Sequence, residues 1–130
     1  MKIHHIGYLV ASVEESIAEF EKLGYISVSN TIYDEAREIN ICFVKNMDTV
    51  IELVSPVGKS SVVYNLYKKM KSSPYHICYE SNNLKQDINK LCSEGYTVIS
   101  NLSPAVAIEN RNVVFLYNNK LGLIELVENS

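Results

Sequence analysis

Two short stretches of the chain, His5-Ile6-Gly7-Tyr8 and His76-Ile77-Cys78-Tyr79, share one pattern and lie 71 positions apart. Apolar residues after each stretch continue to match at the same offset. The later parts match as well, because residues 50–54 (Val-Ile-Glu-Leu-Val) correspond to residues 123–127 (Leu-Ile-Glu-Leu-Val) at an offset of 73. A single match between two short apolar segments often arises by chance, whereas an ordered series of such matches rarely does. The sequence therefore predicts an internal repeat.

The hydrophobic pattern of each repeat predicts a strand, a helix and then three strands. Ser12 is predicted to cap the first helix, with Glu15 completing a capping box and Gly24 ending the helix. Asn83 is predicted to cap the equivalent helix of the second repeat. A short connecting helix is expected between residues 60 and 70. The strands are expected at residues 2–10, 26–33, 39–45, 49–55, 75–80, 97–101, 112–116 and 123–127.

Length and composition restrict the classes of protein to consider. The chain has 130 residues, of which 47% are apolar, and a net charge of −3. This length favours one domain, and the charge argues against nucleic acid or an anionic membrane as a partner. No apolar run approaches the roughly 18 residues of a membrane span, and no signal peptide is visible. Three widely spaced cysteines indicate reduced thiols, so a cytoplasmic location is expected.

One His and one Glu in each repeat are predicted to lie on the same face of their sheet. Side chains of a strand alternate between faces, which puts His5 and Glu52 opposite the apolar face that the helix covers. The same parity applies to His76 and Glu125. Two such sheets facing each other would bring two imidazoles and two carboxylates into one cavity. This donor set suits a divalent metal ion that keeps a coordination position open for water or substrate.

The alternative interpretation is that these residues are structural. A lone His on a strand is more often a satisfied structural residue than a ligand, and this is our prediction for His4, which has the opposite parity and no counterpart. The duplicated His and Glu positions favour the metal site, because a Glu between apolar neighbours is costly to bury without a partner.

The sequence resembles the vicinal-oxygen-chelate superfamily, which includes glyoxalase I, bleomycin-resistance proteins and extradiol dioxygenases. The resemblance covers nearly the whole chain and is nearest to the methylmalonyl-CoA epimerase branch. It rests on residues 5–10, 51–58, 76–80, 113–116 and 124–128.

The resemblance implies an α+β fold in which two tandem βαβββ modules form a curved mixed sheet around a metal-lined cavity. The chain, residues 1–130, would be one domain, with module one at about 1–56, a connecting helix at about 57–74 and module two at about 75–130. The implied metal ligands are His5, His76 and Glu125, with Glu52 at a position that varies between Gln and Glu among relatives. The ion would be Co, Ni, Zn or Mn.

The chemistry implied by the resemblance is the formation of an enolate. The metal takes two oxygens of the substrate, and acid/base groups move a proton on the neighbouring carbon. Glu35 and Glu125 are the residues assigned to catalysis. Glu35 lies in a charged turn that departs from the Pro-Glu-x-Gly segment of the epimerases, so Asp34 and Glu38 are alternative bases and a solvated turn is the structural alternative.

The expected function is that of a metal-dependent epimerase or isomerase acting on a small molecule such as a CoA thioester. Arg111 is expected to bind a carboxylate or thioester oxygen of the substrate, the alternative being an exposed arginine. Lys68, Lys69 and Lys71 either meet CoA phosphates or complement a helix dipole, and the second interpretation is the stronger. A homodimer is expected by resemblance. The alternative functions are a glyoxalase-like lyase or isomerase of a specialised pathway and a non-catalytic small-molecule-binding protein.

Overall fold

The computed structural model describes all residues of the chain, Met1–Ser130, and its fold class is α+β. The helices are α1 (Val13–Glu21), α2 (Tyr64–Met70) and α3 (Leu84–Ser93), with a 3₁₀ helix, η1, at Val106–Ile108. The strands are β1 (Ile3–Leu9), β2 (Ile26–Ser27), β3 (Ile32–Asp34), β4 (Ile39–Asn46), β5 (Thr49–Pro56), β6 (Ser73–Ser81), β7 (Thr97–Val98), β8 (Ser103–Ala105), β9 (Arg111–Asn118) and β10 (Gly122–Glu128). No helix combines the length and apolar character needed to cross a membrane.

Two units make up the chain. The first unit is His5–Tyr75, and the second unit is Met1–His4 together with His76–Ser130. The first four residues thus belong with the C-terminal repeat, where the N–H of Glu80 donates to the carbonyl oxygen of Lys2 at 2.8 Å.

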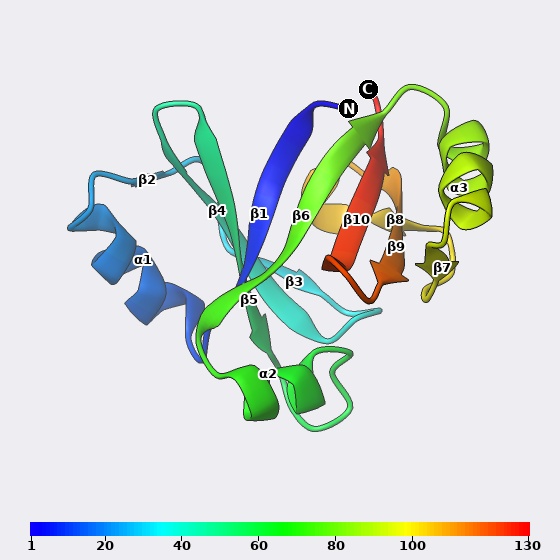
Figure 1. Ribbon diagram of the computed structural model, residues 1–130. Coiled ribbons are helices and arrows are strands. Elements are labelled where there is room, and N and C mark those ends of the chain that lie inside the picture. The colour runs from blue at the N-terminus through cyan, green and yellow to red at the C-terminus, as the bar shows by residue number, and fades with distance from the viewer. The chain divides into compact units, whose positions relative to one another are not determined.

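The two units have the same strand connectivity (Figure 1). In the first unit the order is β2-β4-β5-β1, with β3 also paired to β4, and only the pairing of β1 with β5 is parallel. In the second unit the order is β7-β9-β10-β6, with β8 also paired to β9, and only the pairing of β6 with β10 is parallel. The predicted pair of βαβββ modules is confirmed.

The strand predicted at residues 26–33 is wrong in its extent because it is interrupted, and the strand predicted at residues 97–101 is wrong because it ends at Val98. At these points a serine hydroxyl replaces the backbone carbonyl as the acceptor of a hydrogen bond from the neighbouring strand. The N–H of Phe43 donates to Oγ of Ser29 at 3.0 Å, and the N–H of Phe115 donates to Oγ of Ser100 at 2.8 Å. The ladder therefore stops at the serine, and β2 and β3, like β7 and β8, become separate short strands.

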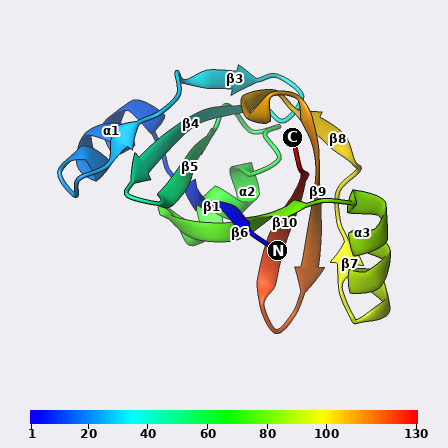
Figure 2. The ribbon, with the colours of Figure 1, turned by 90° about the horizontal axis from the view of Figure 1, so that it is seen from above.

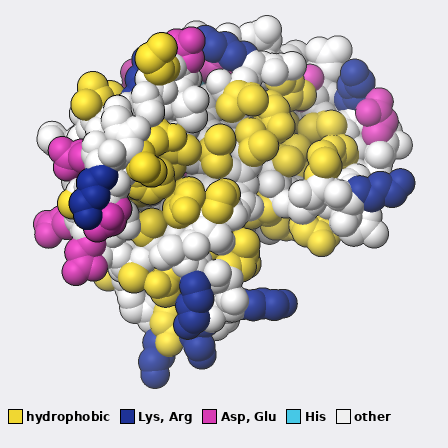
Figure 3. All heavy atoms as spheres, turned by 60° about the vertical axis from the view of Figure 1, so that its left-hand side comes forward, with side chains coloured by type: hydrophobic (Ala, Val, Ile, Leu, Met, Phe, Trp, Pro, Cys, Tyr) yellow, Lys and Arg dark blue, Asp and Glu magenta, His cyan; other side chains and the backbone are white.

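The helix caps are those that the sequence predicts. Oγ of Ser12 accepts the N–H of Glu15 at 3.3 Å, and Oδ1 of Asn83 accepts the N–H of Gln86 at 3.1 Å. Gly24, just beyond α1, has a φ of +96°, a left-handed conformation that glycine adopts without strain. The exposed surface of α1 is acidic, whereas lysines gather at the lower end of the view over α2 (Figure 3).

Each unit has its own core on the face that its helix covers. In the first unit α1 packs against β2, β4 and β5, and the core includes Ile51 and Leu53. In the second unit α3 packs against β7 and β10, and the core includes Ile124 and Leu126 (Figure 2). The candidate ligands lie on the opposite face of each sheet, which the helix does not cover, as the strand parity predicts.

Truncation of one equivalent core leucine in each unit tests this account. Leu53→Ala and Leu126→Ala each remove a fully buried side chain. Each is expected to lower the free energy of unfolding by about 2–5 kcal/mol, through lost burial and the cavity left behind. Urea unfolding followed by circular dichroism measures the change. Leu121→Ala, at a side chain that is 70% exposed, is the control and should stay within about 0.5 kcal/mol of wild type.

Candidate functional site

His5 and Glu52 lie side by side on one face of the sheet in the first unit. Glu52 of β5 is opposite Gly7 of β1 in the parallel register, and His5 precedes Gly7 by two residues, so all three face the same way. Nε2 of His5 lies 3.5 Å from Oε1 of Glu52. Both residues are buried, with exposures of 1% and 6%.

His76 and Glu125 have the equivalent arrangement in the second unit. Glu125 of β10 is opposite Cys78 of β6, and His76 precedes Cys78 by two residues. Nε2 of His76 lies 3.1 Å from Oε1 of Glu125, and both residues are buried. The repeat in the sequence is therefore also a repeat of side-chain geometry.

Each imidazole packs against a phenylalanine that the sequence analysis did not identify. The ring of His5 meets that of Phe43 edge to face, with centroids 5.5 Å apart, and the ring of His76 meets that of Phe115 at 5.1 Å. Phe43 and Phe115 are the residues opposite Glu52 and Glu125 in the antiparallel registers.

The serines that interrupt the strands also hold these phenylalanines, because they accept the phenylalanine N–H groups. The signal for these residues was present in the repeat. Ser29 and Ser100 lie 71 positions apart, and Phe43 and Phe115 lie 72 apart. An apolar or small polar residue in a strand is too common to draw attention until its register is known.

The donor set fits a divalent metal ion. His5, Glu52, His76 and Glu125 are all buried and belong to the types of residue that hold metals in proteins. Two neutral imidazoles and two carboxylates carry a charge of −2, which a divalent cation balances. Buried carboxylates are costly without such compensation, so a bound cation would stabilise both pairs.

The charged turn that contains Glu35 connects β3 and β4 in the first unit. Glu35 is exposed, whereas the side chain of Asp34 is buried, and its Oδ2 accepts a hydrogen bond from Nη1 of Arg37 at 2.8 Å. The turn is bonded to the segment after β5, because Oγ of Ser60 donates to Oε1 of Glu38 at 2.8 Å. Of the three candidate bases, Asp34 and Glu38 thus have defined partners, and Glu35 is open to solvent.

Arg111 stands at the start of β9 in the second unit. Its Nε donates to the carbonyl oxygen of Glu128 at 2.8 Å, and Nη2 lies 3.7 Å from Oε1 of Glu80. The side chain of Arg111 is only 12% exposed. These contacts tie the strand ends of the second unit together.

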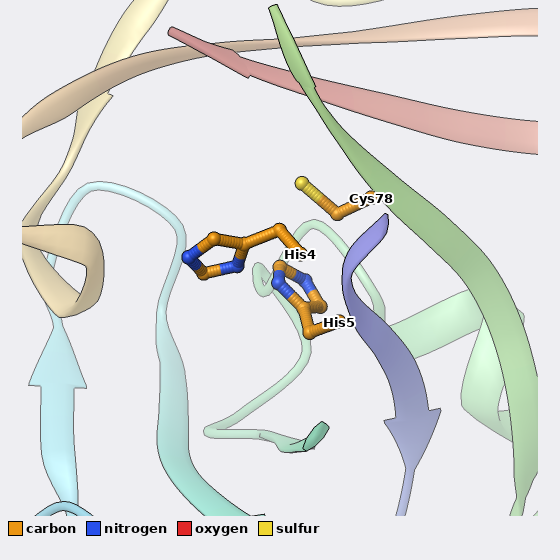
Figure 4. A group of neighbouring side chains, drawn as sticks. All are labelled: His4, His5 and Cys78. Atoms are coloured by element: carbon orange, nitrogen blue, oxygen red, sulfur yellow. The ribbon is translucent and has the colours of Figure 1, made fainter. Parts of the chain in front are cut away.

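His4 and Cys78 are a second combination of metal-binding residue types, and both belong to the second unit (Figure 4). An imidazole nitrogen of His4 and Sγ of Cys78 lie within 4.8 Å of each other. His4 is half-buried and Cys78 is fully buried. The prediction that His4 is structural therefore needs a test of its own.

Known proteins similar to this chain include epimerases. The chain is 27% identical over 130 residues to the mitochondrial methylmalonyl-CoA epimerase of Dictyostelium discoideum, a match that covers 98% of this chain and 78% of the relative. It is 23% identical over 128 residues to the ethylmalonyl-CoA/methylmalonyl-CoA epimerase of Cereibacter sphaeroides, with 96% of each chain covered.

Solved structures of epimerases have the same fold. Methylmalonyl-CoA epimerase from Mycobacterium tuberculosis superposes with a TM-score of 0.85 at 22% identity, covering 99% of this chain and 88% of that one. A methylmalonyl-CoA epimerase in complex with methylmalonyl-CoA and NH4+ superposes with a TM-score of 0.85 at 19% identity, covering 99% and 94%.

A family match covers most of the chain. Residues 4–115 match the glyoxalase/bleomycin resistance protein/dioxygenase superfamily. The matched segment contains His5, Glu52 and His76, and the repeated strand connectivity extends the same architecture to Glu125. The chain therefore belongs to the glyoxalase/bleomycin resistance protein/dioxygenase superfamily.

Proposed function

We propose that this protein is a metal-dependent enzyme that removes a proton next to a carbonyl group, and that its substrate is a CoA thioester of the methylmalonyl-CoA type. The observation that carries the proposal is the pair of buried His–Glu contacts at equivalent positions of two equivalent units. Similarity along nearly the whole chain to methylmalonyl-CoA epimerases supports this choice of substrate and of epimerization as the reaction.

His5, Glu52, His76 and Glu125 are the residues that would hold one divalent ion, Co, Ni, Zn or Mn, between them. When bound, the ion supplies charge that stabilises the enolate oxygen. Phe43 and Phe115 limit the rotation of the two imidazoles by edge-on contact, so the nitrogens stay directed at their carboxylates. The protein thereby positions its ligands before the ion arrives.

Proton transfer is assigned to carboxylates of the chain. Epimerization removes a proton from one side of a carbon and returns one to the other, so it needs two acid/base groups. Glu35 is the proposed first group, because its carboxylate is exposed while Asp34 is paired with Arg37. Glu125 is the proposed second group, through the carboxylate that it also offers to the metal.

A second candidate function is a lyase or isomerase reaction on another carbon acid. The ion pair of the buried Asp34 with Arg37 favours this second function. The pair lies in residues 33–39, the segment in which this chain departs from the pattern that the epimerases share. Both functions would use the same candidate ligands and the same stabilisation of negative charge on the substrate oxygen that a bound divalent ion would supply. The choice of substrate would then follow from the charged turn and from Arg111, the proposed substrate-binding residue.

Loss of a ligand is expected to weaken metal binding. His76→Ala and Glu125→Ala should each lower the affinity for Co²⁺ or Zn²⁺ at least about tenfold, because each removes one donor from the ion. Isothermal titration calorimetry on the metal-free protein measures the affinity. An unchanged affinity in either variant would contradict the assignment.

His4→Ala and Cys78→Ala serve as controls, because each also removes one potential metal donor, an imidazole or a thiol, but from the second combination of residues. Both variants should bind Co²⁺ or Zn²⁺ as the wild type does. A loss of affinity in these two variants, with His76→Ala unaffected, would move the site to His4 and Cys78.

Exchange of the substrate proton with solvent tests the reaction. Wild-type protein loaded with Co²⁺ should introduce deuterium at the α-carbon of methylmalonyl-CoA in heavy water, and chelation should abolish this incorporation. Glu35→Gln should slow the exchange about 10²–10⁴-fold, the range expected for the loss of a general base, while metal affinity stays unchanged. Mass spectrometry measures the incorporated deuterium.

The results separate the two candidate functions. No exchange in wild-type protein that binds metal would exclude this substrate and favour the second candidate. Exchange that is lost in Asp34→Asn but retained in Glu35→Gln would reassign the base to Asp34.

A further inference from the structure

The internal repeat is broken at two positions where the second unit has a metal-binding type of residue. Cys78 corresponds to Gly7 of the first repeat, and His4 corresponds to Tyr75 of the second, at the offset of 71 that relates these segments. Both His4 and Cys78 belong to the second unit. The duplication that accounts for the four candidate ligands therefore does not account for this pair.

The fold brings His4 and Cys78 together, although they lie 74 positions apart in the sequence. The N–H of Glu80 donates to the carbonyl oxygen of Lys2 at 2.8 Å, which ties the first residues of the chain to β6. An imidazole nitrogen of His4 and Sγ of Cys78 lie within 4.8 Å of each other (Figure 4). The pair thus has two donor atoms within the span of a single metal ion.

That separation can accommodate an ion with its two donors on opposite sides. Bonds from a metal to an imidazole nitrogen and to a thiolate sulfur are about 2.0 and 2.3 Å long, so donors in line with the ion lie about 4.3 Å apart. Two donors fill only half of a tetrahedral zinc site. Univalent copper, in contrast, forms stable linear complexes with two ligands, so the pair offers as many donors as this ion requires.

We propose that His4 and Cys78 form a second metal site, which binds a soft univalent cation, Cu(I). A thiolate ligand selects Cu(I), whereas carboxylates favour harder ions. The thiol of Cys78 releases its proton to solvent as the metal–sulfur bond forms. A thiolate and a neutral imidazole together carry a charge of −1, so Cu(I) makes the buried group neutral, whereas a divalent ion leaves a positive charge uncompensated.

Charge and softness therefore distinguish the two groups of donors. The four-residue set of two imidazoles and two carboxylates has a charge of −2 and no sulfur, which favours a divalent ion. Each group is expected to prefer its own kind of ion.

Burial distinguishes Cys78 from an ordinary surface thiol. Its side chain is fully buried, so an ion bound to Sγ is shielded from water and from competing thiols, while the half-buried His4 gives the ion a route from the surface. The other two cysteines have different surroundings. Cys42 packs in the core of the first unit, where its Sγ lies 3.4 Å from the carbonyl oxygen of Ser29, and Cys92 is exposed on α3.

Competition with a chromophoric Cu(I) chelator, under anaerobic and reducing conditions, tests the proposal. Metal-free wild-type protein should withdraw one equivalent of Cu(I) from the chelator. His4→Ala and Cys78→Ala should each lower the affinity for Cu(I) at least about tenfold, because each removes one of two donors. X-ray absorption at the copper edge should find one sulfur and one nitrogen in the wild type, and the nitrogen should be lost in His4→Ala.

Two control variants separate this site from other thiols and from the divalent site. Cys92→Ser removes the exposed thiol and should leave the affinity for Cu(I) unchanged. Glu125→Ala should also leave it unchanged, although the same variant is expected to weaken binding of Zn²⁺. Circular dichroism should find all variants folded.

Three results would overturn the proposal. They are a wild type that takes no Cu(I) from the chelator, binding that is lost in Cys92→Ser, and binding that survives unweakened in both His4→Ala and Cys78→Ala. A copper spectrum without sulfur would do the same. Binding of the divalent ion is measured separately, so this proposal can fail while the proposed function stands.

Discussion

The contact of a buried carboxylate with a buried imidazole is the constraint on which each unit depends. A Glu in the middle of an apolar strand is tolerated inside a protein only beside a group that compensates its charge or donates hydrogen bonds to its carboxylate. His5 meets this need for Glu52, and His76 does so for Glu125. Because both pairs occupy one face of their sheet, the helix of each unit has to cover the opposite face, where the apolar core is found.

The repeat is the reason that so much of this arrangement could be predicted from sequence. A single His or Glu in a strand carries little information, but the same residue at the same place of two strand-helix-strand patterns indicates a shared constraint. Helix ends were equally accessible, since Ser12 and Asn83 act on backbone N–H groups only three residues away. Signals of this kind are local, and their geometry follows from the period of the element alone.

The features that sequence analysis missed depend on contacts between strands. Ser29 accepts a hydrogen bond from a residue 14 positions away, and nothing in the pattern of residues 26–33 reveals that partner. The same is true of Phe43, whose position opposite Glu52 follows from the antiparallel register and not from its neighbours in sequence. Side chains that substitute for backbone groups also end a strand without any glycine or proline, which are the usual indicators of interruption.

The two units are alike in their ligands and differ in their turns. The first unit places Asp34 and Arg37 in a bonded, charged turn, while the equivalent residues 105–108 of the second unit are apolar and include the buried Ile108. A pair of equivalent donor sets cannot by itself distinguish the two ends of a substrate. Discrimination between those ends has to come from residues that the repeat does not share, and the ion pair of Asp34 and Arg37 in the turn between β3 and β4 is one such feature. Duplication therefore accounts for the candidate metal ligands, and divergence of one turn accounts for the proposed first acid/base group, Glu35, which lies in that turn.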